Sequence, residues 1–262
     1  MAEAELNGVT IHYVEEGAGL PYVFVNGLGG NSAGFVAEEM SWYAEQFRTV
    51  AWDQRGLGKS GPASKYSLPV YAADLAALLD HLEIERAVIH GVSWGGVLTQ
   101  RFALDHPDRC AAIVLDSTSS EVNVGASENW YARGELARLG PEALAGRELA
   151  PAFAGHATVS SAPSARAVAP AHVDSYVAQA RATASLREHP MTPYLAAIAC
   201  PTLIVAGGAD TVAGAGGSVV MSRQMPDARL EVMDGVGHGV YREAREQFRP
   251  LLLSFLADSG VA

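Results

Sequence analysis

The stretch that decides the fold is Gly91-Val92-Ser93-Trp94-Gly95, which fits the pattern G-x-S-x-G. Residues 86–90 before it form an apolar, strand-like run, and residues 96–104 after it have the pattern of a helix. A serine on a sharp turn between a strand and a helix is held where its hydroxyl can attack a bound carbonyl. The flanking glycines let the two elements approach closely, because only small residues fit there. We therefore predict that Ser93 is a catalytic nucleophile.

Two residues farther along the chain could complete a serine triad. Asp210 follows the apolar strand pattern of residues 201–206, and His238 follows a second strand pattern at residues 229–233. A histidine can take the serine proton near neutral pH, and a carboxylate fixes the tautomer of that histidine. The residue types and their order along the chain therefore favour acyl transfer.

Strand and helix patterns alternate along most of the chain. Apolar runs at residues 21–25, 49–52 and 111–115 predict strands, and Ser67 can begin a helix whose apolar residues recur at helical spacing. Such alternation predicts an α/β fold, with a mostly parallel, doubly wound sheet and helices on both faces. Ligands bind at the carboxyl ends of the strands in folds of this kind, and the three candidate triad residues all fall there.

The alternation breaks in the middle of the chain. We expect residues 1–116 and 200–262 to form the core, and residues 117–199 to form a helical cap over the site. Helical patterns cover residues 130–155 and 173–187, and the Ala/Ser/Pro-rich stretch at 155–170 is expected to gate entry. Five aromatic residues of this segment favour a pocket lid: Trp130, Tyr131, Phe153, Tyr176 and Tyr194.

Composition narrows the function classes. The chain has 262 residues, 49% of them hydrophobic, and a formal net charge of −11, which argues against nucleic acid or an anionic membrane as a partner. No apolar run approaches the ~18 residues of a membrane span. The acidic start lacks the features of a signal peptide, so we expect a cytoplasmic protein, and Cys110 and Cys200 are expected to be free thiols. The spacing of His and Cys predicts no metal site, and we expect no cofactor.

On its motifs the chain resembles the α/β-hydrolase superfamily over essentially its full length. Within that superfamily it is most similar to 3-oxoadipate enol-lactonases and related small esterases, because Asn26 stands in the first loop and Trp130-Tyr131-Ala132-Arg133 opens the cap. The segments that match the superfamily are Asn26-Gly27-Leu28-Gly29-Gly30, the run from Asp53 to Ser60, Gly91 to Gly96, Gly207-Gly208-Ala209-Asp210 and Gly237-His238.

The resemblance implies an α/β-hydrolase fold with a helical cap insertion. It also implies that Asp210 is the triad acid, although Asp116 and Asp234 are alternatives. It further implies that the backbone N–H groups of Leu28 and Trp94 form an oxyanion hole. The residues that we expect to contact substrate are Asn26, Trp130, Arg133 and Tyr176. Arg133 could pair with a substrate carboxylate, and the alternative is a solvated arginine on a cap helix.

The expected activity is hydrolysis of a small-molecule carboxylic ester or lactone through an acyl-enzyme on Ser93. A carbon–carbon bond hydrolase or a prolyl aminopeptidase-like peptidase would use the same triad, so both remain alternatives. A ligand-binding protein without catalysis could also keep these residues. The sequence leaves the oligomeric state and the substrate open.

Overall fold

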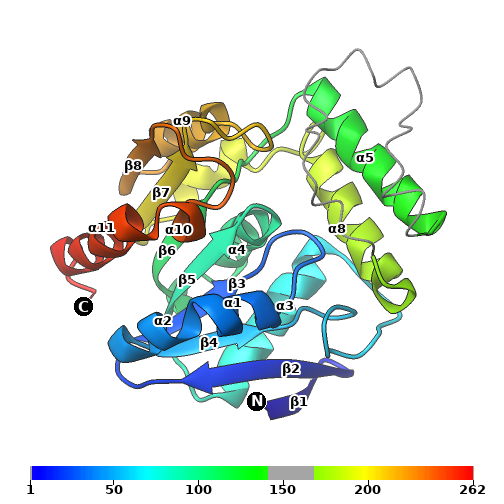
Figure 1. Ribbon diagram of the computed structural model, residues 1–262, viewed down its shortest axis with the longest axis horizontal. Helices are drawn as coiled ribbons and strands as arrows, with labels where there is room; N and C mark the ends of the chain where they lie inside the picture. The colour runs from blue at the N-terminus through cyan, green and yellow to red at the C-terminus, as the bar shows by residue number, and fades with distance from the viewer. Residues whose placement is uncertain (1, 141–167, 262) are drawn as a thin grey trace.

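One eight-stranded sheet organises the molecule, as the computed structural model of residues 2–140 and 168–261 shows (Figure 1). The strand order is β1-β2-β4-β3-β5-β6-β7-β8. The β1–β2 and β2–β4 pairs are antiparallel, and every other pair is parallel, as predicted. The strands are β1 (Ala2–Leu6), β2 (Val9–Glu16), β3 (Pro21–Val25), β4 (Arg48–Trp52), β5 (Ala87–Val92), β6 (Cys110–Asp116), β7 (Thr202–Gly207) and β8 (Ala228–Met233).

Helices cover both faces of the sheet, and each face has its own hydrophobic cluster. One layer consists of α1 (Ser32–Glu38), α2 (Met40–Gln46), α10 (Val240–Glu243) and α11 (Arg245–Asp258). The other consists of α3 (Leu68–His81), α4 (Trp94–Asp105) and α9 (Ala215–Gln224). Short 3₁₀ turns lie at Pro107–Arg109, Pro170–His172 and Thr192–Ala197.

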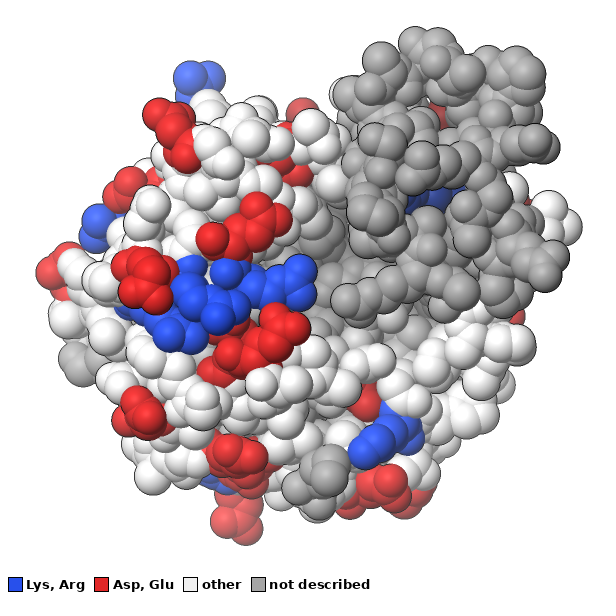
Figure 2. All heavy atoms as spheres, viewed as in Figure 1, with Lys and Arg blue, Asp and Glu red and all other residues white. Residues whose placement is uncertain are grey.

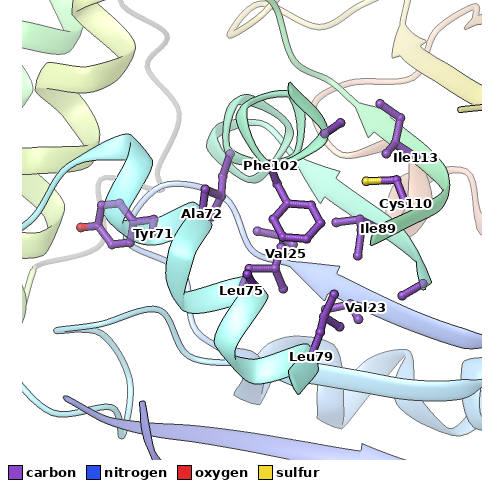
Figure 3. Close-up of a cluster of buried hydrophobic side chains, with 14 of the residues drawn as sticks. Val23, Val25, Tyr71, Ala72, Leu75, Leu79, Ile89, Phe102, Cys110 and Ile113 are labelled. Atoms are coloured by element: carbon purple, nitrogen blue, oxygen red, sulfur yellow. The ribbon is translucent and has the colours of Figure 1, made fainter. Parts of the chain in front are cut away.

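The packing of α3 and α4 fixes the strand that leads to Ser93. Figure 3 shows Phe102 of α4 next to Leu75 of α3, with Val25 and Ile89 of the central strands beneath them. Phe102, Leu75 and both strand residues are fully buried or nearly so. Burial of one such side chain contributes roughly 1.5–3 kcal/mol, so this layer holds β5 firmly against its neighbours.

Two helical stretches are each divided in two. The first is interrupted at Glu39, between α1 and α2, and the second at Ala244, between α10 and α11. The Glu39 carboxylate is buried and is bound by Arg245 at 2.7 Å and by Arg249 at 3.0 Å. This contact joins α11 to the start of α2, and such tertiary pairing is not visible in local periodicity.

A pair of helices, α5 (Val124–Arg138) and α8 (Val173–Ser185), stands side by side beyond the carboxyl edge of the sheet (Figure 1). The helix expected at 130–155 therefore begins earlier, at Val124. Residues 141–167 lie outside the described residues. That range includes Phe153 and almost all of the 155–170 stretch, so the expected gate is not described.

Charged side chains of both signs lie together on the face shown in Figure 2. Where α10 and α11 lie, Arg242 approaches Glu38 at 4.0 Å, and Arg245 and Arg249 bind Glu39. Cys110 and Cys200 are free thiols, as predicted. No helix in residues 2–140 and 168–261 is long and apolar enough to cross a membrane.

Candidate active site

Ser93 occupies a strained turn between β5 and α4. Its φ of 56° and ψ of −118° lie in a region that a residue with a side chain rarely adopts. The Ser93 N–H donates to Asp116 O at 2.9 Å, and the Thr118 hydroxyl donates to Ser93 O at 2.7 Å. A Cβ atom on Gly91 or Gly95 would overlap backbone carbonyl oxygens, so glycine is required at both positions. The surrounding structure therefore holds Ser93 in its strained conformation.

His238 and Asp210 are brought together from the ends of neighbouring strands. Asp210 follows β7, His238 follows β8, and Nδ1 of His238 lies 2.8 Å from Oδ2 of Asp210. The other carboxylate oxygen accepts the N–H groups of Val212 at 2.7 Å and Ala213 at 3.1 Å. Burial opposes ionisation of Asp210, but the hydrogen bond and electrostatic attraction of His238, together with the two backbone N–H groups, outweigh it and lower the pKa of its carboxyl. Asp210 is therefore ionised near neutral pH and can orient His238.

Asp116, the alternative acid, has other partners. It is fully buried, and its carboxylate accepts the N–H groups of Val240 at 3.0 Å and Tyr241 at 2.9 Å. The neighbouring Ser117 hydroxyl donates to Asp116 and accepts the N–H of Gly239 at 2.9 Å. Asp116 thus anchors the backbone that follows His238, whereas the side chain of His238 contacts Asp210.

The first glycine-rich loop, residues 26–30, lies directly after β3. Gly30 N–H donates to Gly27 O at 3.0 Å, which closes a tight turn, and Gly29 has a φ of 65°. In the described part of the chain, neither the backbone N–H of Leu28 nor the backbone N–H of Trp94 donates to another residue. Both N–H groups are therefore available to a ligand, as an oxyanion hole requires.

A cavity of about 680 Å³ opens at Ser93. Its floor is the turn at Ser93, and its walls come from the segment after β6, the α5–α8 pair and the loop that carries Asp210. The lining residues are Ser93, Trp94, Val97, Ser117, Thr118, Ser119, Glu121, Val122, Asn123, Val124, Ala126, Trp130, Thr183, Leu186, Arg187, Val212, Ala213, Gly216, Gly217 and Val220. The volume suits a small molecule.

The four residues expected to contact substrate fall into different places. Trp130 lines the cavity, but Asn26, Arg133 and Tyr176 are not among its lining residues. The Asn26 amide lies 3.5 Å from Trp52 O, and Tyr176 packs against Gly29. The guanidinium of Arg133 stacks on Trp130, 5.2 Å from the ring centroid. Direct contact of these three with substrate stays a prediction.

The sequence reasoning missed several residues that the structure brings to this region. Among the described residues that line the cavity, Arg187 and Glu121 are the charged ones, and the Glu121 carboxylate accepts the Thr192 hydroxyl at 2.6 Å. Gln54 and Gln179 are buried beside the glycine-rich loop. Gln179 follows Tyr176 at helical spacing on the buried side of α8, so a polar residue on that side was the available signal. No local sequence pattern indicated that Arg187 would line the cavity.

Among residues 2–140 and 168–261, no group of three or more His, Cys, Asp or Glu side chains is arranged to hold a metal ion.

Comparison with known proteins gives consistent matches. A family model described as the alpha/beta hydrolase fold matches residues 21–244. The 3-oxoadipate enol-lactonase 2 of Acinetobacter baylyi is 27% identical over 218 residues, which cover 81% of this chain and 79% of that relative. A Caulobacter protein assigned as a carbamate hydrolase is 31% identical over 243 residues, which cover 89% of each chain.

Among solved structures, the enol-lactonase from Burkholderia xenovorans LB400 superposes with a TM-score of 0.81. The match covers 98% of this chain and 100% of that one, at 24% sequence identity. Similarity at this level of identity supports the fold, and the predicted architecture is confirmed.

Proposed function

Because the chain belongs to the alpha/beta hydrolase fold family, we propose that it is a serine hydrolase that cleaves a small carboxylic ester or lactone. The observation that carries the proposal is the 2.8 Å contact between His238 and Asp210, together with Ser93 on its strained turn at the floor of a cavity. The named activity of an enol-lactonase relative agrees with this chemistry.

In the proposed mechanism, Ser93 Oγ attacks the carbonyl carbon while His238 takes the serine proton. The carbonyl oxygen becomes an oxyanion, which the N–H groups of Leu28 and Trp94 stabilise. Collapse of the tetrahedral intermediate breaks the bond to the leaving oxygen, and protonated His238 returns its proton to that oxygen. A water molecule then attacks the acyl carbon while His238 takes its proton, and collapse of the second tetrahedral intermediate breaks the bond to Ser93 Oγ. Protonated His238 returns the proton to that oxygen, and the carboxylic acid is released. Asp210 stabilises the imidazolium in both halves of the reaction.

The cavity favours a small substrate with an anionic group. Arg187 is the cationic residue of the lining, and no described residue forms an ion pair with it, whereas Glu121 already accepts a hydrogen bond. An arginine can bind a carboxylate through two parallel N–H donors. In this proposal residues 117–199 form a cap over the core of residues 1–116 and 200–262. Arg187 of the cap would bind the substrate carboxylate while the ester carbonyl lies at Ser93.

A carbamate is the second candidate substrate. The observation that favours it is the 31% identity over 89% of each chain to the Caulobacter protein assigned as a carbamate hydrolase. The same nucleophile would then carry a carbamoyl group in place of an acyl group, and no additional residue would be needed.

A substrate panel tests the proposal. Steady-state rates are measured with p-nitrophenyl esters, simple lactones, an aryl carbamate, a diketone with a cleavable carbon–carbon bond and a prolyl arylamide. We expect turnover of esters or lactones that disappears in Ser93→Ala. Turnover of the diketone alone would indicate a carbon–carbon bond hydrolase, and turnover of the arylamide alone would indicate a peptidase; either result would contradict this proposal. Ligand binding without turnover of any compound would indicate a binding protein.

A further inference from the structure

A chain of buried amide groups joins helix α8 to the loop at residues 26–30. The Gly29 N–H donates to Oε1 of Gln179 at 2.8 Å, and Nε2 of Gln179 donates to Oε1 of Gln54 at 2.9 Å. Gln54 and Gln179 are 1% and 0% exposed, so water cannot replace these partners. α8 therefore contacts the proposed oxyanion loop through directed hydrogen bonds.

Gln54 connects this series of hydrogen bonds to both sides of the proposed oxyanion hole. Its Oε1 also accepts the indole N–H of Trp94 at 2.9 Å, and its Nε2 donates to Asn26 O at 3.2 Å. Trp94 supplies one proposed oxyanion donor. Asn26 lies two residues before Leu28 and Gly29 directly after it, and Leu28 supplies the other proposed donor. The two donors come from distant parts of the sequence. Gln54 is bonded on both sides of the hole, and Gln179 is bonded to Gly29 and to Gln54.

The network has one self-consistent arrangement. An amide nitrogen only donates and an amide oxygen only accepts, so turning over the side chain of Gln179 would direct its NH₂ group at the Gly29 N–H. Turning over Gln54 would likewise direct its NH₂ group at the indole N–H of Trp94. Each reversal would bury two donors against each other, which costs about 1–3 kcal/mol for every unsatisfied group. The network therefore fixes the positions of Gly29 and the Trp94 indole relative to the two glutamines, and it also stabilises the fold.

Oxyanion donors act only when they are placed accurately. They must lie roughly 2.7–3.1 Å from the developing oxyanion, and a misplacement of about 1 Å can cost about 100-fold in rate. We infer that Gln179 is a positioning residue, which sets the oxyanion hole from the cap side through Gly29 and Gln54. This inference rests on the proposed function, since it concerns the same site. Gln179 itself does not touch the reacting atoms.

The same helix provides a matched control. Ser175 lies one turn before Gln179 and is also buried, and its hydroxyl donates to Arg55 O at 2.8 Å. It also lies 2.8 Å from the Tyr71 hydroxyl. Ser175 thus attaches α8 to the core without any bond to residues 26–30. A loss that comes only from weaker attachment of α8 should appear equally in Ser175→Ala.

The experiment compares Gln179→Met with Ser175→Ala in the full chain. Methionine keeps the approximate volume of glutamine but removes both hydrogen bonds. We expect Gln179→Met to lower kcat for p-nitrophenyl acetate by about 10–100-fold, with KM changed less than about three-fold, because the oxyanion forms only in the transition state. Amide hydrogen exchange at residues 26–30 should become faster. Ser175→Ala should leave both kcat and this exchange close to wild type.

Several outcomes would overturn the inference. These are equal losses of kcat in the two variants, a change in KM alone, or unchanged exchange at residues 26–30 in Gln179→Met. If the wild type cleaves no ester, the proposed function fails. The exchange data then decide separately whether Gln179 holds the loop.

Gln179→Glu provides a second variant should the methionine variant not fold. In this variant a protonated carboxyl group can accept from the Gly29 N–H and donate to Gln54, but an ionised carboxylate cannot donate. The ratio of variant to wild-type kcat should therefore increase as the pH is lowered, because burial favours the protonated acid. A ratio that does not change with pH would contradict the positioning role.

Discussion

The carboxylate of Asp210 lies 2.8 Å from Nδ1 of His238, and its other oxygen is held by two backbone N–H groups. With Nδ1–H donating to a fixed carboxylate, the proton of neutral His238 resides on Nδ1 and Nε2 remains the basic nitrogen. The side chain of Asp210 is fully buried, whereas that of His238 is 27% exposed. The carboxylate is thus shielded from water, while the imidazole remains partly exposed, as the proposed roles of acid and base require.

Replacing the proposed nucleophile, Ser93, gives the first prediction. Ser93→Ala should reduce kcat for a p-nitrophenyl ester by about 10⁴-fold or more, because triad residues act as a unit. The thermal midpoint should not fall. Within the described residues the Ser93 hydroxyl forms no hydrogen bond that the substitution would remove. Activity close to wild type in a folded variant would exclude Ser93 as the nucleophile.

The two candidate acids should behave differently. Asp210→Asn should lower kcat by about 10⁴-fold, because an asparagine no longer favours the tautomer with the proton on Nδ1. Asp116→Asn places an NH₂ group near the N–H groups of Val240 and Tyr241, so it should mainly lower stability, by about 1–3 kcal/mol. Both variants are compared by kcat and by urea unfolding. A greater loss of kcat in Asp116→Asn would reverse the assignment.

Asp210 should also contribute a pH-dependent part of the stability. Its pKa is lower in the folded protein, so the unfolded state binds more protons and folding is favoured as the pH rises. This contribution is fully present above the unfolded pKa of about 3.9 and is lost as the pH falls through the lower, folded value. The measurement is the difference in unfolding free energy between wild type and Asp210→Asn across this range. We expect the difference to shrink at acid pH, and a constant difference would contradict the argument.

Arg187 should select substrates that carry a carboxylate. Arg187→Gln is expected to raise KM about 10-fold or more for an ester with a free carboxylate, since hydrogen bonds to charged groups are worth about 1.5–3 kcal/mol. Its effect on the uncharged methyl ester should be small. Arg133→Gln is the matched control, because Arg133 stacks on Trp130 and does not line the cavity. If Arg133→Gln alone discriminates between the two esters, the anionic group binds at Arg133.

Features that depend on local sequence pattern could be predicted from the sequence alone. Buried parallel strands are continuous apolar runs, so β3 was predicted with its observed ends, Pro21 and Val25. The turn at Ser93 was predicted from its flanking glycines, and the structure leaves no room for a Cβ atom at Gly91 or Gly95. The sequence singled out Asp210 and His238 because each follows a strand at the carboxyl edge of one sheet, and the structure brings their side chains into contact.

Features that depend on tertiary contacts were not predictable. The break at Glu39 reflects two arginines of α11, which lie about 200 residues away in the sequence. Arg187 lines the cavity just beyond the end of α8, and the buried side of α8 is bonded to the core through Gln179 and Ser175. Helical spacing showed which residues share a side of α8, but it could not show what that side contacts.

Covalent labelling tests the proposed mechanism most directly. The protein is treated with a fluorophosphonate ester, which reacts with activated serines, and the modified peptide is identified by mass spectrometry. The triad predicts one phosphonyl group on Ser93 in the wild type, with much slower labelling in Asp210→Asn and none at this position in Ser93→Ala. An unlabelled Ser93, or a label on a different residue that persists in Ser93→Ala, would contradict the account.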